Sequence, residues 1–452
     1  MPKTNWRNLW HGREVKAMSA AASFPWASIV LLAFSILILT VTRGFAEEGT
    51  VKLSELIREA LKNNPEIHVA EARQDASQHK IPQATSLADP MFMMGYENEG
   101  TDSIYNFNRD TKGMPADSRW MFSLSQMFPY PGKLALKGEM AARDAEGMQV
   151  MADSMKLNTV VRVRELYNDL FATYTTIDLL NDKATLFSRI EDAAVARYSA
   201  GMAPQQEVLM AQTEKYMLLE REEMERQKIR SLEAMLNAAV GRDTNVALGR
   251  PEKPPETPYG YGLDELIAAA YEKYPLIKFR EKMVGSAEAK LKMAKREYYP
   301  DVTVGASYFA RSQQFPDMWN LTATINIPLF YKTKQREGVL EAKASLLEAQ
   351  REVEAAKLMA SSTLRDNFAM LKSTESLMAL YRQGLIPKAN QDFELALAGY
   401  VTGKVEAITV ITRLKALIDY ELLYWRQFAD RQKAAARLNG LAAITDNGAD
   451  EK

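Results

Sequence analysis

Four short stretches of the chain alternate between apolar and polar residues, as a strand with one apolar face does. The clearest runs from Trp319 to Ile327, where every second residue is apolar and the residues between are Asn or Thr. We predict strands at about 90–99, 119–128, 301–309 and 319–327. Their expected apolar faces include Phe92, Trp120, Val302, Val304, Trp319, Leu321, Ala323 and Ile325.

Long helices are predicted after each pair of strands. Residues 134–200 contain no proline, and 67 helical residues would extend roughly 100 Å. A second long helix is expected at about 334–399, where Pro387 should bend the helix without ending it. In the last helix, Ile411, Leu414, Ile418, Leu422 and Trp425 recur at spacings of three and four, which indicates coiled-coil-like packing against other helices.

The chain contains an internal repeat. The segment Leu53–Ile67 aligns with Leu263–Ile277 at an offset of 210, with seven of fifteen positions identical. The same offset pairs Pro90 with Pro300, while an offset of 199 pairs Pro129 with Pro328. We therefore expect a first repeat at 47–250, a proline-rich linker at 251–258, a second repeat at 259–441 and a flexible tail at 442–452. Each repeat has the order helix, strand, strand, helix.

The amino terminus has the layout of a secretory signal peptide. Arg13 and Lys16 precede an apolar run, and cleavage is expected after Ala46, so that residues 1–46 are removed. The alternative is an uncleaved transmembrane anchor, because the uncharged stretch 24–42 is long enough to span a bilayer.

Composition excludes several functions. The net charge of −1 does not favour a nucleic-acid partner. The chain has no cysteine, so disulfides, thiolate metal sites and a cysteine nucleophile are excluded. There is no phosphate-binding glycine loop, zinc-protease motif or nucleophile elbow. We therefore predict no catalytic residues, no cofactor and no metal centre, and the protein is not expected to be an enzyme.

The predicted strands have two interpretations: a soluble sheet covering a core, or a transmembrane barrel facing lipid. Their length of nine or ten residues is that of a tilted transmembrane strand, and Trp120 and Trp319 stand where an aromatic girdle belongs. Four strands with open edges cannot face lipid alone. A membrane barrel therefore requires several chains, and three would supply twelve strands.

The repeat, the strand pairs within it, the helix lengths and the matching Tyr-x-x-Gly turns at Tyr198–Gly201 and Tyr400–Gly403 together resemble the TolC-type outer-membrane efflux family. The resemblance covers about residues 53–441. It implies a mainly α protein with a membrane β-barrel part, in which a homotrimer forms a 12-stranded barrel and a long periplasmic tunnel. It also implies a passive conduit for drugs, metal ions or other small molecules, supplied by an inner-membrane pump through a periplasmic adaptor.

The resemblance places the tunnel tip at the two turns, which would contact the adaptor or form a gate. The expected residues there are Tyr198, Gly201, Pro204, Tyr400, Gly403, Lys404, Glu406 and Arg413. Thr409 and Thr412 stand where the best-known channel of the family has gating aspartates, so that gate is not carried over. Lys404, Glu406 and Arg413 are the local charges that could form another latch.

Two further interpretations stay open. Met91 and Met93 are expected to face the lumen, where thioethers could contact Cu(I), although methionine is also a common packing residue of this chain. The main alternative function is a periplasmic coiled-coil scaffold with a soluble hairpin; a periplasmic enzyme is the second. Cell fractionation separates these alternatives, because a barrel stays with the outer membrane.

Overall fold

A computed structural model describes residues 50–99, 117–311 and 315–444. The proposed signal peptide, and the tail beyond residue 444, lie outside the described residues. The elements are, in order, α2 (Leu53–Asn63), α3 (Pro65–Thr85), β1 (Met91–Glu99), β2 (Asp117–Phe128), α4 (Lys133–Ser199), α5 (Gln205–Val240), α6 (Leu263–Lys273), α7 (Pro275–Arg296), β3 (Val302–Arg311), β4 (Met318–Ile325), α8 (Gln335–Leu380), the π-helical turn η1 (Tyr381–Leu385), α9 (Ile386–Val401) and α10 (Ala407–Leu441).

The repeat is visible in the order of elements. Each copy consists of two short helices, a strand pair, a long helix, a tight turn and a returning helix. The short helices meet at matching prolines, Pro65 and Pro275, each in the first turn of the following helix, where a missing N–H costs nothing. In the first copy the Asn64 side chain also caps α3, accepting from Glu66 N–H at 2.7 Å.

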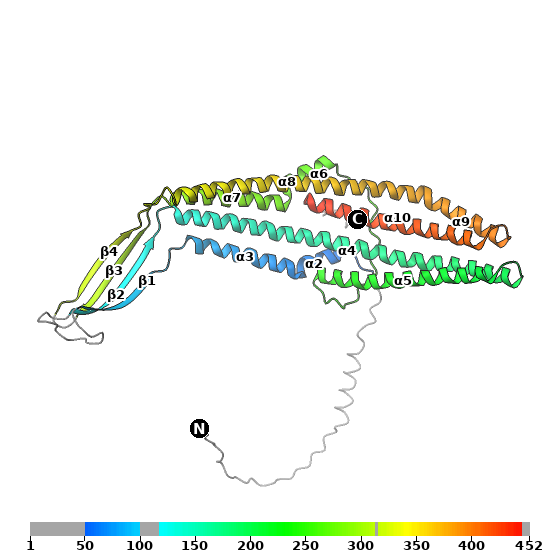
Figure 1. Cartoon of the computed structure of the whole chain (residues 1–452), viewed down its shortest axis with the longest axis horizontal. Helices are drawn as coiled ribbons and strands as arrows, with labels where there is room; N and C mark the ends of the chain where they lie inside the picture. The colour runs from blue at the N-terminus through cyan, green and yellow to red at the C-terminus, as the bar shows by residue number, and fades with distance from the viewer. Residues whose placement is uncertain (1–49, 100–116, 312–314, 445–452) are drawn as a thin grey trace, which may run out of the picture. The chain divides into compact units, whose positions relative to one another are not determined.

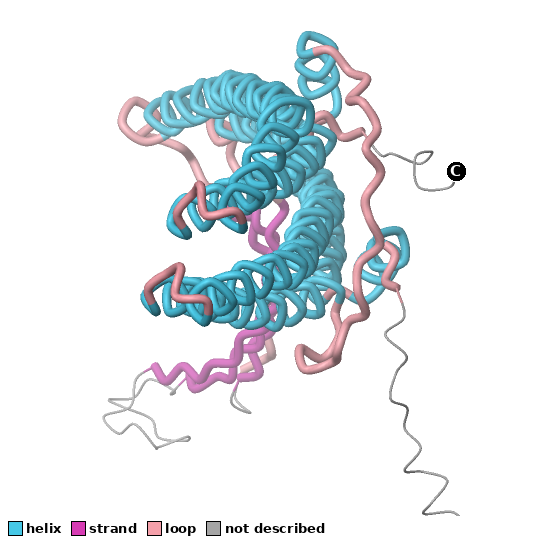
Figure 2. The backbone as a smooth tube through the Cα atoms, turned by 90° about the vertical axis from the view of Figure 1, so that its right-hand side faces the viewer, coloured by secondary structure: helices cyan, strands magenta, loops and turns pink. Residues whose placement is uncertain are grey.

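The four strands form one antiparallel sheet in the order β1-β2-β3-β4. Against this sheet end, α3, α4, α7 and α8 lie side by side in the same order, each packing on the next. In Figure 1 the sheet lies at one end of these helices, and the two turns that end α4 and α9 lie at the other. Figure 2 looks along the helices from the turn end and shows them in an arc.

Several element ends differ from the predicted ones by one or two residues, and two differences have a clear physical cause. The last strand was expected to reach 327, but β4 ends at Ile325. The last hydrogen bond to β3 is donated by the Asn326 N–H to Asp301 O at 3.1 Å. Hydrogen-bonded pairs alternate along an antiparallel ladder, so the next one would include Pro328, which has no N–H to donate. The long helix expected at 334–399 continues to Val401, and its departure from α geometry lies before Pro387, at η1. There the Ile386 N–H reaches back to Tyr381 O, so the proline falls in the first turn of α9.

Buried apolar residues form several clusters along the helices, and the largest cluster lies in the half nearest the turns. There α4, α5, α9 and α10 share one buried apolar cluster, whose largest members are Phe187, Phe393 and Tyr400. The predicted stripe on the last helix takes part, since Ile411, Leu414 and Ile418 are fully buried. Long helices without a globular core are therefore stabilised here by packing against one another.

The two copies are also tied together where the sheet meets the helices. The rings of Tyr130 and Tyr299 stack with centroids 4.5 Å apart. The buried ammonium of Lys133 lies 2.9 Å from Asp301 and 3.4 Å from Glu297, and donates to Tyr299 O. Three acceptors compensate the cost of burying this charge.

Candidate functional site: the helical tips and the sheet faces

The two turns at the helix ends have the same backbone. After α4, Gly201 has a φ of 71° and Met202 N–H donates to Arg197 O at 2.8 Å. After α9, Gly403 has a φ of 76° and Lys404 N–H donates to Gly399 O at 2.8 Å. These left-handed positions explain why both predicted turns require glycine. Pro204 and Glu406 then begin α5 and α10 as their N-caps.

The two tyrosines of the turns have different surroundings. Tyr198 is 48% exposed, whereas Tyr400 is fully buried. The Tyr400 hydroxyl donates to Glu207 at 2.8 Å, and the Arg197 guanidinium lies over the Tyr400 ring, 4.6 Å from its centroid. Arg197 also donates to the Tyr400 carbonyl. Arg197 and Glu207 belong to the first copy. Tyr400 therefore joins the helical hairpin of the first copy, α4 and α5, to that of the second copy, α9 and α10, at their tips.

Electrostatics keep the Tyr400 hydroxyl protonated. Burial, together with the hydrogen bond to Glu207, raises the pKa of the Tyr400 phenol well above its ordinary value of 10.0. The hydroxyl therefore remains a donor across the pH range in which bacteria live.

The charges predicted for a latch lie apart from the contact between the two tips. Lys404 and Glu406 are exposed, and no ion pair involving either was found within the described ranges. Arg413 pairs with Asp392 at 3.1 Å, inside its own hairpin. The contact between the hairpins instead uses Arg197 and Glu207, which the sequence did not single out. Each is some 200 residues from Tyr400, and nothing in the local pattern indicates their contact.

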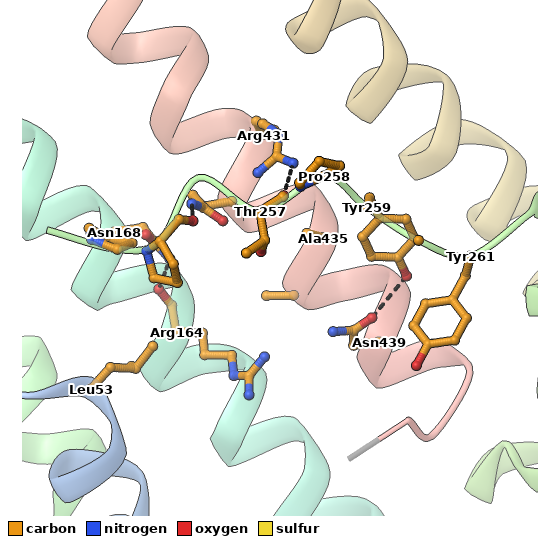
Figure 3. Close-up of a pocket in the computed structure, with 15 residues that line it drawn as sticks. Leu53, Arg164, Asn168, Thr257, Pro258, Tyr259, Tyr261, Arg431, Ala435 and Asn439 are labelled. Carbon is orange, nitrogen blue, oxygen red and sulfur yellow. Dashed lines mark hydrogen bonds between the residues drawn. The ribbon is translucent and has the colours of Figure 1, made fainter. Parts of the chain in front are cut away.

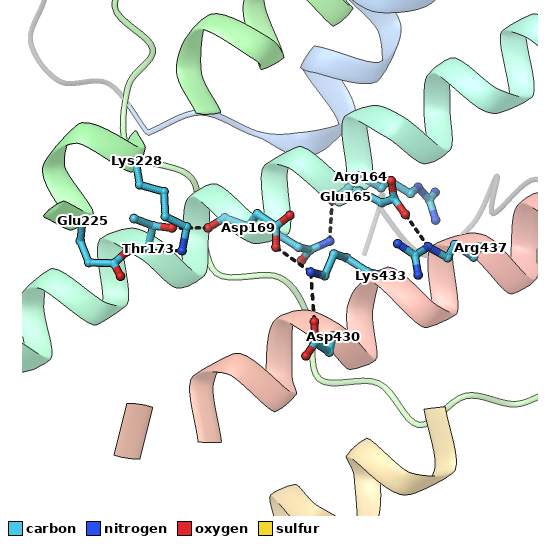
Figure 4. Close-up of polar contacts among 10 residues, drawn as sticks. Arg164, Glu165, Asp169, Thr173, Glu225, Lys228, Asp430, Lys433 and Arg437 are labelled. Carbon is cyan, nitrogen blue, oxygen red and sulfur yellow. Dashed lines mark hydrogen bonds and ion pairs between the residues drawn. The ribbon is translucent and has the colours of Figure 1, made fainter. Parts of the chain in front are cut away.

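Polar contacts continue along the boundary between the hairpins. Lys415 of α10 lies 2.9 Å from Glu214 of α5, and the mostly buried Lys183 of α4 lies 2.9 Å from Glu421. Farther from the tips, Lys433 of α10 lies 2.8 Å from Asp169 of α4. Figure 4 marks this contact with a dashed line. The two carboxylates of Asp169 and Asp430 outweigh burial and raise the pKa of Lys433. Charged pairs thus follow this boundary from the tips to the middle of the helices.

The linker lies against this middle region. A cavity of about 290 Å³ lies between the linker, α4 and α10. Figure 3 shows the residues that line it. Arg431 donates to Thr257 O, and Tyr259 donates to Asn439 at 2.8 Å. These contacts hold the extended, proline-rich linker against the helices. The cavity is therefore a space left by packing beside the linker. Within residues 50–99, 117–311 and 315–444, no group of three or more His, Asp or Glu side chains could hold a metal ion.

The strand register settles which residues share a face. Phe92 lies opposite Leu124, Leu124 opposite Ala306, and Ala306 opposite Leu321. The same register places all predicted apolar residues on one face: Phe92, Trp120, Val302, Val304, Trp319, Leu321, Ala323 and Ile325. Met91 and Met93 lie on the other face, with Ser125 and Ser123 opposite them.

The apolar face is left uncovered. Trp319 is 74% exposed and Leu321 is 70% exposed. A soluble sheet covering a core would bury such residues. Among the helices that the structure describes, none is both long and apolar enough to cross a bilayer.

Comparison with known proteins identifies the architecture. Residues 56–242 and 266–443 match the family model described as outer membrane efflux protein. The chain belongs to this family. It is an outer-membrane efflux channel protein of TolC type, a transport protein and not an enzyme, with its helices in the periplasm. Channels of this family form trimers within tripartite pumps. No protein of curated function matches the chain by sequence.

Solved structures agree on the fold. A membrane protein from Pseudomonas aeruginosa superposes with a TM-score of 0.75 at 16% identity, covering 86% of this chain and 90% of that one. The outer membrane protein VceC from Vibrio cholerae gives 0.70 at 16% identity, covering 86% and 95%. The Campylobacter jejuni CmeC outer membrane channel gives 0.71 at 12% identity, covering 86% and 85%. The predicted fold class, repeat and family are therefore confirmed.

Proposed function

We propose that three copies of this outer membrane efflux protein close into one channel, whose 12-stranded barrel crosses the outer membrane. The observation that carries this proposal is the uncovered apolar face of a sheet with two unpaired edges, β1 and β4. Backbone groups at an open edge cannot face lipid unsatisfied. The lipid-facing residues would then be those of the apolar face, and the polar face would line the lumen.

The helices support the same closure. The outer helices of the layer, α3 and α8, each carry exposed apolar residues that no described helix covers. On α8 these are Leu340, Leu347 and Leu358, which are 44%, 54% and 71% exposed; on α3, Val69 is 48% exposed. Sheet and helices follow the same order, so edge β4/α8 of one chain would meet edge β1/α3 of the next.

The contact between the two copies suggests the register at that new edge. Within the chain, Met127 of the first copy lies opposite Thr303 of the second. The repeat offsets carry this pair to the edge between two chains. Adding 199 to Met127 gives Asn326, and subtracting 210 from Thr303 gives Met93, so Asn326 of one chain would lie opposite Met93 of the next. In the same way, the pair Phe128–Val302 becomes Ile327 opposite Phe92. Apolar residues then meet apolar ones and the faces are kept.

Barrel geometry agrees with this register. Across one chain, Phe92 lies level with Leu124, Ala306 and Leu321. In the proposed register, Leu321 would lie opposite residue 98 of the next chain, which is six residues beyond Phe92. Each chain therefore shifts the strand register by six residues. Six residues rise roughly 20 Å while four strand spacings cover roughly 19 Å. The resulting tilt of about 46° is close to the range of about 35–45° for outer-membrane barrels. A shift of eight residues would require about 54°.

Cysteine cross-linking tests the trimer and its register together, because the chain has no cysteine of its own. Asn326→Cys combined with Met93→Cys should give a covalent trimer on oxidation. Matched controls combine Asn326→Cys with Met91→Cys or with Gly95→Cys, which shift the partner by two residues on the same face. A stronger cross-link in a control would refute the register. A monomer by native mass measurement in detergent would refute the channel.

The tips supply the proposed contact with other components. The exposed turn residues Tyr198, Gly201 and Pro204, with Gly403, Lys404 and Glu406, form the end of the periplasmic helices farthest from the sheet. We infer that this end receives cargo from an inner-membrane pump through a periplasmic adaptor. The contact of Tyr400 with Arg197 and Glu207 would hold the tips closed, in place of a latch through Arg413.

A coiled-coil scaffold with a soluble hairpin is the alternative, and the same preparation decides it. A scaffold would leave the cell with the soluble periplasmic fraction and would need no detergent. A channel would be extracted only from the outer membrane.

A further inference from the structure

The polar face of the first strand pair is rich in methionine. Met91 and Met93 lie on this face of β1, opposite Ser125 and Ser123. Met121 and Met127 occupy the same face of β2, because they are separated from Ser123 and Ser125 by two residues. Four thioethers therefore share one face of one hairpin, and we call Met127, Met91, Met93 and Met121 the thioether ladder.

The ladder is continuous along the strands. Met127 is diagonal to Met91, Met91 and Met93 are neighbours along β1, and Met93 is diagonal to Met121. Diagonal positions in an antiparallel pair are roughly 7–8 Å apart, within reach of long side chains. The ladder thus runs from the helix end of the sheet towards its loop end.

Packing does not explain these methionines. Met91 is 65% exposed, Met93 is 53% exposed and Met127 is 39% exposed. At the offsets of 210 and 199, the second copy has Asp301, Thr303, Asn320 and Asn326 at the positions of Met91, Met93, Met121 and Met127. This face therefore accommodates polar side chains in the second copy, whereas the first copy has methionine at all four positions. The second hairpin has a methionine on this face at Met318, whose sulfur accepts from Arg311 at 3.2 Å.

We propose that the thioether ladder binds a soft monovalent cation, Cu(I) or Ag(I), in transit through the barrel. Thioethers are the neutral side chains that prefer such ions, and hard cations would not select them. The ion would move by exchange between neighbouring sulfurs, with no change in its oxidation state and no proton transfer. Several weak sites in a row suit passage, because each must release the ion again. The proposal rests on the trimer, since only a closed barrel makes this face a lumen.

Two arginines, Arg119 and Arg311, lie opposite each other at the loop end of this face. Arg119 is 2.6 Å from Glu97, so its charge is balanced at the level beyond Met121. The cross-strand neighbours of the ladder carry no charge: they are Ser125, Ser123, Thr303, Gly95 and Phe309.

Silver titration of the purified trimer in detergent tests the ladder, because Ag(I) is not readily oxidised. Met93→Leu with Met121→Leu keeps the volume and removes two sulfurs, and should weaken Ag(I) binding at least about 10-fold. Met94→Leu is the matched control, since Met94 lies on the opposite face of the same strand and is 57% exposed. It should bind Ag(I) like the unmodified protein.

Three results would overturn the proposal: no Ag(I) binding by the intact trimer, equal binding by the double variant, or equal loss in Met94→Leu. Equal export of apolar cargo by all three proteins is expected, since leucine keeps the apolar surface. If the double variant also lost export of apolar cargo, the thioether ladder would be a contact surface for apolar cargo and not a cation site. Native mass measurement on each sample shows whether the trimer is present, so failure of the trimer is seen separately.

Discussion

The two helical tips have one backbone and two different environments. Both turns use a glycine in the left-handed region and the same hydrogen bonds. Yet Tyr198 projects from the first turn, while Tyr400 is buried between the hairpins and bonded to both Arg197 and Glu207. The two copies thus share the backbone of the turn but not the residues that contact its tyrosine. The first tip is free to meet another molecule, and the second is held by the first.

Truncating each tyrosine should give the largest difference between the tips. Tyr400→Ala removes a buried aromatic side chain and should lower the free energy of local opening by about 3–5 kcal/mol. Tyr198→Ala should change it by less than about 0.5 kcal/mol, because surface substitutions rarely do more. Hydrogen exchange of amides at the ends of α9 and α4 measures both. Similar protection losses in the two variants would mean that the tips are equivalent.

Removing only the hydroxyl should have a smaller and pH-dependent effect. Tyr400→Phe loses a hydrogen bond to a charged group, expected to cost about 1.5–3 kcal/mol at neutral pH. Because the folded-state pKa of Tyr400 is raised, this contribution is fully present below about pH 10 and is lost as the pH rises through the folded value. The unmodified tip should therefore lose protection in alkali, while Tyr400→Phe should show little further change. An equally steep loss in Tyr400→Phe would assign the pH dependence to another group.

Charge reversal beside the second turn should have the smallest effect on stability and still alter function. Lys404→Glu and Glu406→Lys are exposed changes, expected to stay within about 0.5 kcal/mol. If these charges contact an adaptor or pair between chains, each should change drug susceptibility at normal trimer levels. The double reversal should partly restore it if they pair. Unchanged susceptibility in all three variants would remove both charges from the gate and leave Tyr400 as its centre.

The sequence by itself determined the local structure. Period-two alternation placed the strands, proline-free length gave α4, and the repeated Tyr-x-x-Gly marked both turns, because these features depend on residues close together in the chain. The alternation also separated the faces correctly, since a strand's side chains point to opposite sides regardless of what lies beyond it. Pro328 also limits the last strand, because it has no N–H to donate at the next hydrogen-bonded pair of the β3–β4 ladder.

Only the tertiary structure decided which distant residues meet. Tyr400 reaches Arg197 and Glu207, and Lys133 reaches Asp301, across separations of more than 160 residues. Charged and polar side chains occur on every solvated helix face of this chain, so their identity does not reveal their partner. The thioether ladder likewise needed the register of β1 with β2, because Met121 and Met127 join Met91 and Met93 only when the two strands are paired. Packing of the helices and pairing of the strands fix these contacts, and local sequence does not.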